Sequence, residues 1–248
     1  MSLLDVKNVS FGYSRSRVVL NDVSLTIKRG ASIGLVGESG SGKTTLLRLL
    51  LGLIKPTTGT ITLEGTPVDP GNGAFMRGYR RQVQAVFQDP YSSLDPRQNV
   101  LSIVSEPLRS LKIAGDHKQM ISDALAAVGL ERTILARYPH EFSGGQRQRI
   151  AIARAIVAGP TLLLADEAVS ALDLSTRIRI VELLKRLSEQ MTLVLVSHDL
   201  GVVAALCEEI VILEHGKIVE AGATRQILAA PQHPYTQKLL ASVPRMPA

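Results

Sequence analysis

Hydrophobic and polar residues alternate along the first thirty positions of the chain. Leu4, Val6 and Val9 form one alternating series, and a second series runs over residues 18–27. Alternation of this kind places one face of a strand against a core and the other face in solvent. The pattern therefore predicts an antiparallel layer of strands that ends at the turn Lys28-Arg29-Gly30.

Short apolar runs typical of buried strands lie at residues 32–36, 161–165, 192–196 and 210–213. Further strands are predicted at residues 60–63 and 83–87. Amphipathic segments between them predict helices over 44–53 and 175–190. Apolar strands that alternate with helices indicate a mainly parallel sheet covered on both faces.

The middle of the chain changes to a helical period. From residue 98 to about residue 158 apolar residues recur three and four positions apart, as at Val100, Leu101 and Val104. We therefore predict an all-helical subdomain within an α/β core. The expected parts are a core over 1–88 and 160–232, a helical subdomain over 89–159 and a tail over 233–248.

Composition narrows the class of protein. The chain has 248 residues, of which 45% are hydrophobic and 20% charged, as in ordinary globular α/β domains. No run approaches the roughly eighteen apolar residues of a membrane span, and the first seven residues lack the layout of a signal peptide. We expect a cytoplasmic protein. The single cysteine, Cys207, is expected to be a small core residue on a helix.

The formal net charge of +6 allows contact with nucleic acid or with an anionic membrane surface. The basic residues are dispersed, however, and the densest patch, Arg77, Arg80 and Arg81, precedes a strand and has no interleaved stacking aromatics. A solvated basic surface that also meets phosphates is the favoured interpretation, and no nucleic-acid partner is expected.

A glycine-rich loop lies between the predicted strand 32–36 and the predicted helix 44–53. Its backbone N–H groups and the helix N-terminus suit phosphate oxygens, Lys43 neutralises them, and the Thr44 hydroxyl can ligate Mg²⁺. The candidate ATP-binding residues here are Gly37, Glu38, Ser39, Gly40, Ser41, Gly42, Lys43, Thr44 and Thr45.

Two carboxylates follow the predicted strand 161–165. Asp166 is placed at the carboxyl edge of the sheet, where it is expected to position Mg²⁺. Glu167 is the candidate base that polarises the water attacking the γ-phosphate. A solvated acidic pair at a strand end is the alternative interpretation, and the phosphate loop argues against it.

A second glycine motif, Phe142-Ser143-Gly144-Gly145-Gln146, opens a predicted helix. Such a turn presents free N–H donors without obstruction by side chains. A simple helix cap would explain Ser143 but not the paired glycines.

Together with the phosphate loop and Asp166-Glu167, this motif makes the chain resemble the ATP-binding subunits of ABC (ATP-binding cassette) transporters. The resemblance covers nearly the whole chain and implies the P-loop cassette fold: a mainly parallel core, an N-terminal antiparallel β layer and a helical subdomain. It also implies that Ser143, Gly144, Gly145 and Gln146 bind the γ-phosphate of ATP held by the opposite subunit. Phe142 replaces the leucine usual in the family.

The resemblance assigns roles to three further residues. Tyr13 matches the aromatic that stacks on adenine, Gln88 matches the glutamine that reaches Mg²⁺ or the attacking water, and His198 matches the histidine that contacts the γ-phosphate. Alone, Tyr13 and His198 would more often be structural residues. Glu167, His198 and Gln88 are thus the candidate catalytic residues, and Thr44, Gln88 and Asp166 the candidate Mg²⁺ ligands.

Residues 170–173, Ser-Ala-Leu-Asp, match the family's loop that crosses the dimer interface. Beside them the family usually has Asp-Glu-Pro, whereas this chain has Ala168 after Glu167. The backbone there is less restrained than proline would make it, and we expect a modest effect on ATPase activity.

Two segments resemble one branch of the family, the oligopeptide/dipeptide/nickel importers. They are the loop from Gln88 to Arg97 and the segment His233-Pro234-Tyr235-Thr236, with Leu239, Leu240 and Pro244 beyond it. Taken alone, the second segment would be an ordinary turn before a short helix. The chain ends at Ala248, and with Cys207 as its one cysteine it is not expected to hold an iron–sulfur cluster.

The resemblance implies an ATP-hydrolysing subunit, with ATP and Mg²⁺ as cofactors, that energises uptake of peptides, nickel or a metal chelate. The implied partners are a second ATP-binding subunit, either a different paralogue or an identical copy, two membrane permeases and, indirectly, an extracytoplasmic solute-binding protein. The implied location is the cytoplasmic face of the cell membrane.

Two other functions stay open. One is the motor of an exporter or of an importer for another solute. The other is a soluble ABC ATPase acting on DNA or ribosomes, although such proteins usually carry a long coiled-coil insert or two cassettes, and the sequence has neither.

Overall fold

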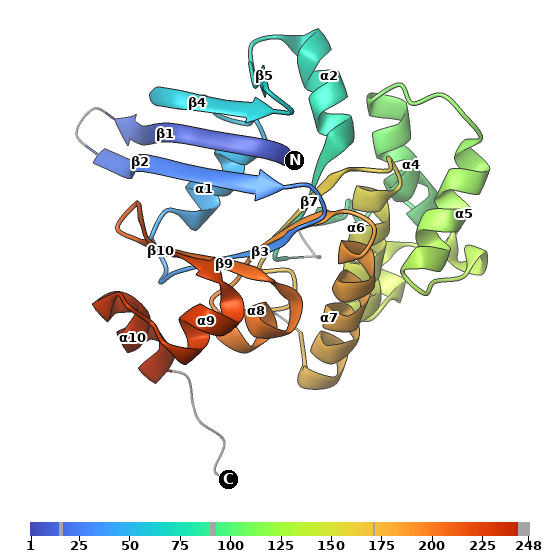
Figure 1. The fold of residues 1–248 in the computed structure, drawn as a ribbon. Coiled ribbons are helices and arrows are strands. Elements are labelled where there is room, and N and C mark those ends of the chain that lie inside the picture. The colour runs from blue at the N-terminus through green and yellow to red at the C-terminus, as the bar shows by residue number, and fades with distance from the viewer. Residues whose placement is uncertain (15–16, 90–92, 171, 243–248) are drawn as a thin grey trace. The chain divides into compact units, whose positions relative to one another are not determined.

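The computed structural model describes residues 1–14, 17–89, 93–170 and 172–242 (Figure 1). It divides into two compact units. The first consists of Met1–Asn72 and Thr192–Ala248, and the second of Gly73–Met191.

The first unit contains the predicted antiparallel layer. Its strands pair in the order β2-β1-β4-β5, with bounds β1 Ser2–Ser14, β2 Arg17–Lys28, β4 Thr58–Leu63 and β5 Thr66–Pro67. Leu4, Val6 and Val9 are buried as their alternation predicts. The prediction of an antiparallel N-terminal layer is confirmed.

The same unit contains parallel strands around β3 (Ser32–Val36). This strand is buried along its whole length and pairs in parallel with both β8 (Thr192–Val196) and β9 (Glu209–Glu214). The strand β10 (Lys217–Ala223) pairs antiparallel with β9. Each of the apolar runs at 32–36, 192–196 and 210–213 is therefore confirmed as a buried strand.

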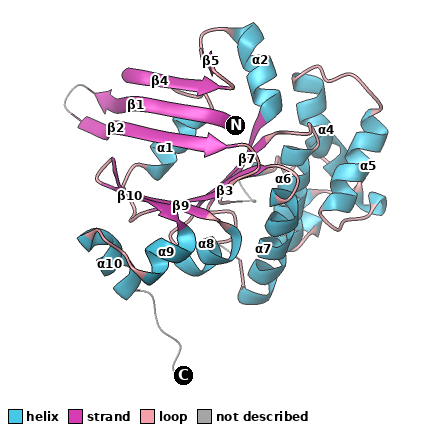
Figure 2. Cartoon of the chain, in the orientation of Figure 1, coloured by secondary structure: helices cyan, strands magenta, loops and turns pink. Residues whose placement is uncertain are grey.

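Helices cover these strands. In Figure 2, α8 (Leu200–Leu206), α9 (Thr224–Ala229) and α10 (Pro234–Ala241) gather on the side of β9 and β10 that faces away from the antiparallel layer. Helix α8 contacts β3, and α9 contacts β9 and β10. Helix α1 (Lys43–Leu50) follows the phosphate loop and contacts β2.

The second unit pairs β6 (Val83–Val86) in parallel with β7 (Leu162–Asp166). Its helices are α2 Gly73–Gln82, α4 Val100–Ser110, α5 His117–Ala127, α6 Gly144–Ile156 and α7 Leu174–Ser188. Short 3₁₀ turns lie at Arg132–Ile134 and Pro139–Glu141. Since α4, α5 and α6 contact one another, the helical character predicted for the middle of the chain is confirmed. The predicted limits of the domains stay a prediction.

Residues 73–82 form helix α2, which was not predicted from the sequence although Met76 and Tyr79 bury one face of it. Helix α1 ends at Leu50 rather than near 53, because Gly52 adopts a φ of 63° and turns the chain. Cys207 is buried at the end of α8 as predicted, and burial raises the pKa of its thiol to about 12. None of the described helices is long and apolar enough to cross a membrane.

The contact of α8 with β3 depends on a glycine. A methyl group on Gly34 would lie 2.5 Å from Val203 Cγ1, whereas a methyl group on Gly78, in the exposed face of α2, would meet no atom within 4 Å. We expect Gly34→Ala to lower the free energy of unfolding by about 1–3 kcal/mol through overpacking. The matched change Gly78→Ala is expected to raise it by up to about 1 kcal/mol, because alanine favours helix. Urea denaturation measures both changes, and an equally stable Gly34→Ala variant would contradict the packing argument.

Candidate functional site

The phosphate loop lies between β3 and α1 in the first unit, as predicted. Gly42 is the N-cap of α1 with a φ of 108°, and Gly40 has a φ of 84°. Both angles fall in the left-handed region that favours glycine. The loop can therefore curl back on itself before the helix, which is the shape that directs successive N–H groups inward.

Neighbouring segments hold this loop at close range. A methyl group on Gly37 would lie 2.3 Å from the Leu213 carbonyl oxygen on β9, and one on Gly42 would lie 2.7 Å from Leu20 Cδ2 on β2. The Gly216 N–H, in the turn between β9 and β10, donates to the Ser41 carbonyl at 3.0 Å. The glycines are thus required by close packing as well as by backbone conformation.

Lys43 is buried and lies against the loop. Its Nζ donates to the carbonyl oxygens of Gly37 and Glu38, both at 2.8 Å. Thr44 is exposed, whereas Thr45 is buried. Ser41 Oγ is buried and has no hydrogen-bond partner among the described residues. A cation and polar groups in this arrangement suit the oxygens of a bound phosphate chain.

Tyr13 presents an exposed ring held at its hydroxyl. The residue is 55% exposed, and its Oη accepts from Arg48 Nη1 at 3.0 Å and lies 3.4 Å from Thr45 Oγ1. These contacts, Thr45 first and Arg48 second, lower the pKa of Tyr13. The Phe11 ring meets the Tyr13 ring edge to face with centroids 5.0 Å apart. An aromatic fixed at one end and open on a face fits base stacking.

His198 lies two residues after the end of β8, in an exposed position next to Asp199, which caps α8. This placement at the carboxyl end of a parallel strand agrees with the sequence-based expectation. Its contact with a γ-phosphate stays a prediction.

In the second unit Asp166 ends β7, as predicted, and Glu167 follows it with a φ of 45°. A residue with a side chain in the left-handed region costs about 1–2 kcal/mol relative to the usual conformation. Strain of this kind persists only where surrounding contacts hold it, and it concentrates at functional sites. Glu167, the candidate base, therefore has a strained backbone at the end of β7.

Hydrogen bonds hold the strained turn and connect it to Gln88. The Glu167 carbonyl accepts from Ser170 N at 3.1 Å and from Ser170 Oγ at 3.0 Å. Gln88 Nε2 in turn donates to Ser170 Oγ at 3.3 Å. Ala168 is 1% exposed, so its methyl group packs where the family usually has proline. The structure thus brings Gln88, Glu167 and Ser170 together, a connection that sequence spacing did not predict.

The residues predicted to hold Mg²⁺ offer suitable donors. Thr44 supplies a hydroxyl, Gln88 an amide oxygen and Asp166 a carboxylate, and Mg²⁺ prefers oxygen ligands. Within the described part of the chain, no group of three or more His, Cys, Asp and Glu side chains could hold a metal ion unaided. An ion that takes one or two protein ligands and completes its shell with phosphate oxygens and water fits this donor set.

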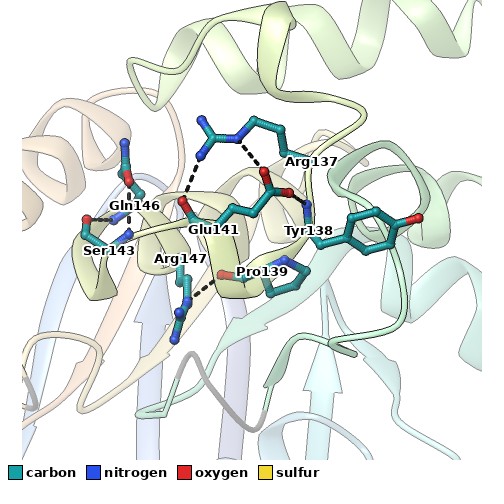
Figure 3. A network of polar contacts seen from close by, with 7 residues as sticks. All are labelled: Arg137, Tyr138, Pro139, Glu141, Ser143, Gln146 and Arg147. Atoms are coloured by element: carbon teal, nitrogen blue, oxygen red, sulfur yellow. Dashed lines mark hydrogen bonds and ion pairs between the residues drawn. The ribbon is translucent and has the colours of Figure 1, made fainter.

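The second glycine motif begins α6 as predicted, and a capping box stabilises the start of this helix (Figure 3). Ser143 Oγ accepts from Gln146 N at 3.3 Å, and Gln146 Oε1 accepts from Ser143 N at 3.0 Å. This reciprocal pair fixes the first turn of the helix. Ser143 and Gln146 therefore have a structural role whatever else they bind.

The two glycines of this motif differ in what surrounds them. A methyl group on Gly145 would lie 2.3 Å from Thr176 Cγ2 on α7, so packing within the chain requires glycine there. A methyl group on Gly144 would meet no atom within 4 Å. No packing contact among the described residues accounts for Gly144, and its open face suits a group that comes from outside the chain.

Phe142, which replaces the family's leucine, has a specific partner. The Arg137 guanidinium lies over its ring, with Cζ 4.4 Å from the ring centroid, and Phe142 is 4% exposed. Arg137 Nη2 also donates to the Glu141 carbonyl at 2.7 Å, and Arg147 Nε donates to the Pro139 carbonyl at 2.6 Å (Figure 3). The aromatic ring thus adds a cation–π contact, of the kind worth about 0.5–1 kcal/mol or more, to the segment before the motif.

Sequence reasoning missed two arginines near the site. Arg137 escaped notice, although an arginine five residues before an aromatic that replaces leucine was an available signal. Arg154 on α6 donates to the Ser93 carbonyl at 2.6 Å and so connects α6 to the loop after Gln88. No local pattern indicates that contact. Residues 90–92 of this loop, Ala171 of the 170–173 segment and Pro244 of the tail lie outside the described residues.

Two segments of this chain match described protein families. Residues 20–170 match the family described as "ABC transporter", and residues 219–248 match "Oligopeptide/dipeptide transporter, C-terminal region". A Brucella abortus (strain 2308) protein named "Putative peptide import ATP-binding protein" is 45% identical over 234 residues, covering 91% of this chain and 69% of that protein. A Brucella ovis protein of the same description is 43% identical over 249 residues, covering 98% and 78%.

Solved structures agree in fold. The cbiO1 protein from Clostridium perfringens, described as part of the ABC transporter complex cbiONQ, aligns with a TM-score of 0.84 at 27% identity over 92% of this chain and 91% of that one. The ATP-binding cassette MJ0796, described as dimeric and bound to ADP and Pi, aligns with a TM-score of 0.79 at 31% identity over 90% and 99%. The predicted cassette fold is confirmed.

The pH dependence of stability can test whether the Asp173 carboxylate caps α7 in its ionised form. It caps α7, and its Oδ1 accepts from Thr176 N at 3.0 Å and from Ser175 Oγ at 2.7 Å. These bonds, Thr176 first, lower the pKa of the Asp173 carboxyl from 3.8 to about 2. Its stabilising contribution is therefore complete above about pH 4 and is lost as the pH falls toward about 2. Carboxyl NMR titration should give a midpoint near the lower value.

The matched variant Asp173→Asn keeps an oxygen that can cap the helix but cannot titrate. Its unfolding free energy should change less steeply between about pH 4 and pH 2 than that of the unaltered chain. An Asp173 midpoint close to 3.8 would contradict the cap as an ionised acceptor.

Proposed function

This chain belongs to the ABC transporter family, and from that premise we propose that it is the ATP-hydrolysing subunit of an importer that carries peptides across the cytoplasmic membrane. The observation that carries the proposal is the joint match of residues 20–170 to the ABC transporter family and of residues 219–248 to the oligopeptide/dipeptide transporter region. The Brucella relatives, whose names describe peptide import, support the choice of solute. Nickel or a metal chelate is the alternative cargo within the same branch.

In the proposed mechanism the first unit holds the nucleotide. The ring of Tyr13 stacks on adenine, the N–H groups of residues 37–45 surround the β- and γ-phosphates, and Lys43 exchanges its two loop carbonyls for phosphate oxygens. His198 contacts the γ-phosphate. Mg²⁺, bound through Thr44, Asp166 and Gln88, would neutralise charge on the phosphates.

Hydrolysis then depends on Glu167. Its carboxylate orients and polarises the water that attacks the γ-phosphate, while Gln88 helps to position that water. The strained backbone at Glu167, held through Ser170, supports this role because it fixes the direction of the side chain in advance. Gln88 shares that hydrogen-bonded turn, so a shift of the Gln88 loop would move the base as well.

We further propose that the motif at 143–146 completes the site of a second ATP-binding subunit. The open face of Gly144 supports this, since no contact within the described part of the chain requires glycine there. The dimeric state described for MJ0796 is consistent with it. The partner is a different paralogue or an identical copy, and residues 170–173 lie at the interface between the two subunits.

The remaining proposed partners are two membrane permeases and, through them, an extracytoplasmic solute-binding protein. The chain would sit as a peripheral subunit on the cytoplasmic face of the membrane. ATP would close the dimer and hydrolysis would reopen it, which drives alternating access in the permeases. The description of cbiO1 as part of a transporter complex is consistent with such an assembly.

One competing function has some support. A bacterial Atm1-family ABC exporter with ATP bound aligns with a TM-score of 0.80 at 25% identity, over 97% of this chain and 42% of that one. The cassette fold is therefore compatible with export. The names of the Brucella relatives, which describe peptide import, favour import over export.

The decisive experiment replaces the candidate base. We expect Glu167→Gln, as the sole copy in the native host, to abolish uptake of a labelled oligopeptide while the complex purified from membranes retains bound ATP. Binding survives because the phosphate loop is unchanged, whereas the polarised water is lost. Loss of ⁶³Ni uptake instead would replace peptide by nickel as cargo. Full ATPase activity in the purified complex would refute the role of Glu167.

A second variant tests the composite site. We expect Gly144→Ala to leave the free energy of unfolding within about 0.5 kcal/mol, because its methyl group would lie more than 4 Å from every atom of the described residues apart from its chain neighbours and the backbone of its own helix. ATP binding by the isolated chain should also be unchanged. The ATPase rate of the assembled complex should fall at least about tenfold, since the methyl group would obstruct donors to the partner's γ-phosphate. An unimpaired complex would show that the motif does not contact nucleotide.

A further inference from the structure

The segment His233-Pro234-Tyr235-Thr236 is built into the first unit in a specific way. His233 is the N-cap of α10, and its Nδ1 accepts from Tyr235 N at 3.2 Å. Pro234 occupies the first helical position, where no N–H is needed. The Glu220 carboxylate on β10 accepts from the backbone N–H groups of Gln232 and His233 at 2.9 and 3.1 Å. The start of α10 is therefore fixed relative to β10.

This fixed start directs Tyr235 toward the phosphate loop. The residue is 7% exposed, and its Oη accepts from the Glu38 backbone N–H at 2.8 Å. Burial raises the pKa of the Tyr235 phenol, so the group that accepts the bond is the neutral hydroxyl. A side chain 197 positions away in the sequence thus supplies a hydrogen-bond partner to the second residue of the loop.

The Glu38 carbonyl is held as well. It accepts from Lys43 Nζ at 2.8 Å and from Ser41 N at 3.2 Å. Both polar backbone groups of Glu38 therefore have partners, and only the partner of its N–H lies outside the loop. The Tyr235 hydroxyl, rather than an acceptor within the loop, thus satisfies this backbone donor.

We propose that Tyr235 is a positioning residue of the phosphate loop. Its hydroxyl keeps the Glu38 peptide in the orientation from which the following N–H groups and Lys43 receive the β- and γ-phosphates, and it does not touch ATP. The inference rests on the proposed function, because it assigns to the C-terminal region a part in the nucleotide site of the same subunit. Each residue of the His-Pro-Tyr sequence then has a role. His233 caps α10, Pro234 begins the helix, and Tyr235 extends to the Glu38 N–H.

The test is Tyr235→Phe, which keeps the buried ring and removes the hydroxyl alone. For the isolated chain we expect the dissociation constant of a fluorescent ATP analogue to rise about two- to tenfold, the effect of one hydrogen bond that orders a binding loop. In the assembled complex KM for ATP should rise by a similar factor with kcat within about twofold, because the contact acts on binding before the chemical step.

A merely structural tyrosine would behave differently. Its loss would lower the melting temperature and the active fraction while the dissociation constant of the folded protein stayed the same. Tyr138→Phe, the same chemical change at an exposed tyrosine of the second unit, provides the matched control and should leave nucleotide affinity unchanged. Equal affinities for Tyr235→Phe and the unaltered chain would overturn the inference.

The cap gives a rescue test. His233→Ala should weaken ATP-analogue binding in the same direction as Tyr235→Phe, because Tyr235 N loses its acceptor and the start of α10 loosens. His233→Asn should restore affinity, since asparagine is among the preferred N-caps. Failure of asparagine to restore it would contradict the role of the cap. If the unaltered chain bound no ATP analogue, the proposed function itself would fall, an outcome distinct from these.

Discussion

The conformation of the phosphate loop depends on the segments packed against it as well as on its own bonds, in which Lys43 Nζ and Ser41 N donate to loop carbonyls. The carbonyl of Leu213 leaves no room for a side chain on Gly37, Leu20 leaves none on Gly42, and Tyr235 accepts the Glu38 N–H. A binding loop made of glycine and backbone is thus held by strands and a helix that come from far away in the sequence.

The second unit applies the same physical logic to a carboxylate. Glu167 holds a left-handed backbone conformation that would be unfavourable alone, and the bonds from Ser170 to its carbonyl make it persist. Gln88 joins this turn through the same hydroxyl. The glycine motif before α6 is held by its capping box and by the close approach of Thr176 to Gly145, which leaves Gly144 open. In both places contacts within the chain fix the backbone that carries the chemically useful group, which is the Glu167 carboxylate in one place and the open face of Gly144 in the other.

Local patterns predicted most of the fold because the spacing of apolar residues along the sequence marks which face of a strand or helix is buried. The alternation of Leu4, Val6 and Val9 and the apolar runs at 32–36 and 192–196 correspond to buried faces. Helix α2 escaped prediction because Met76 and Tyr79 provide its only buried positions and Arg77, Arg80 and Arg81 make the segment mostly polar. The motifs gave the phosphate loop, Asp166, Glu167 and residues 143–146, since each motif is a contiguous string whose backbone geometry is local.

The sequence by itself determined the class of fold, the family resemblance and which residues could meet ATP, because those signals lie within short stretches of chain. Only the tertiary structure decided how these residues are supported. The bond from Arg154 to Ser93, the bond from Gln88 to Ser170 and the bond from Glu38 to Tyr235 join positions whose separation no local period encodes. Such contacts arise when strands and helices pack, and packing depends on the whole set of apolar faces at once.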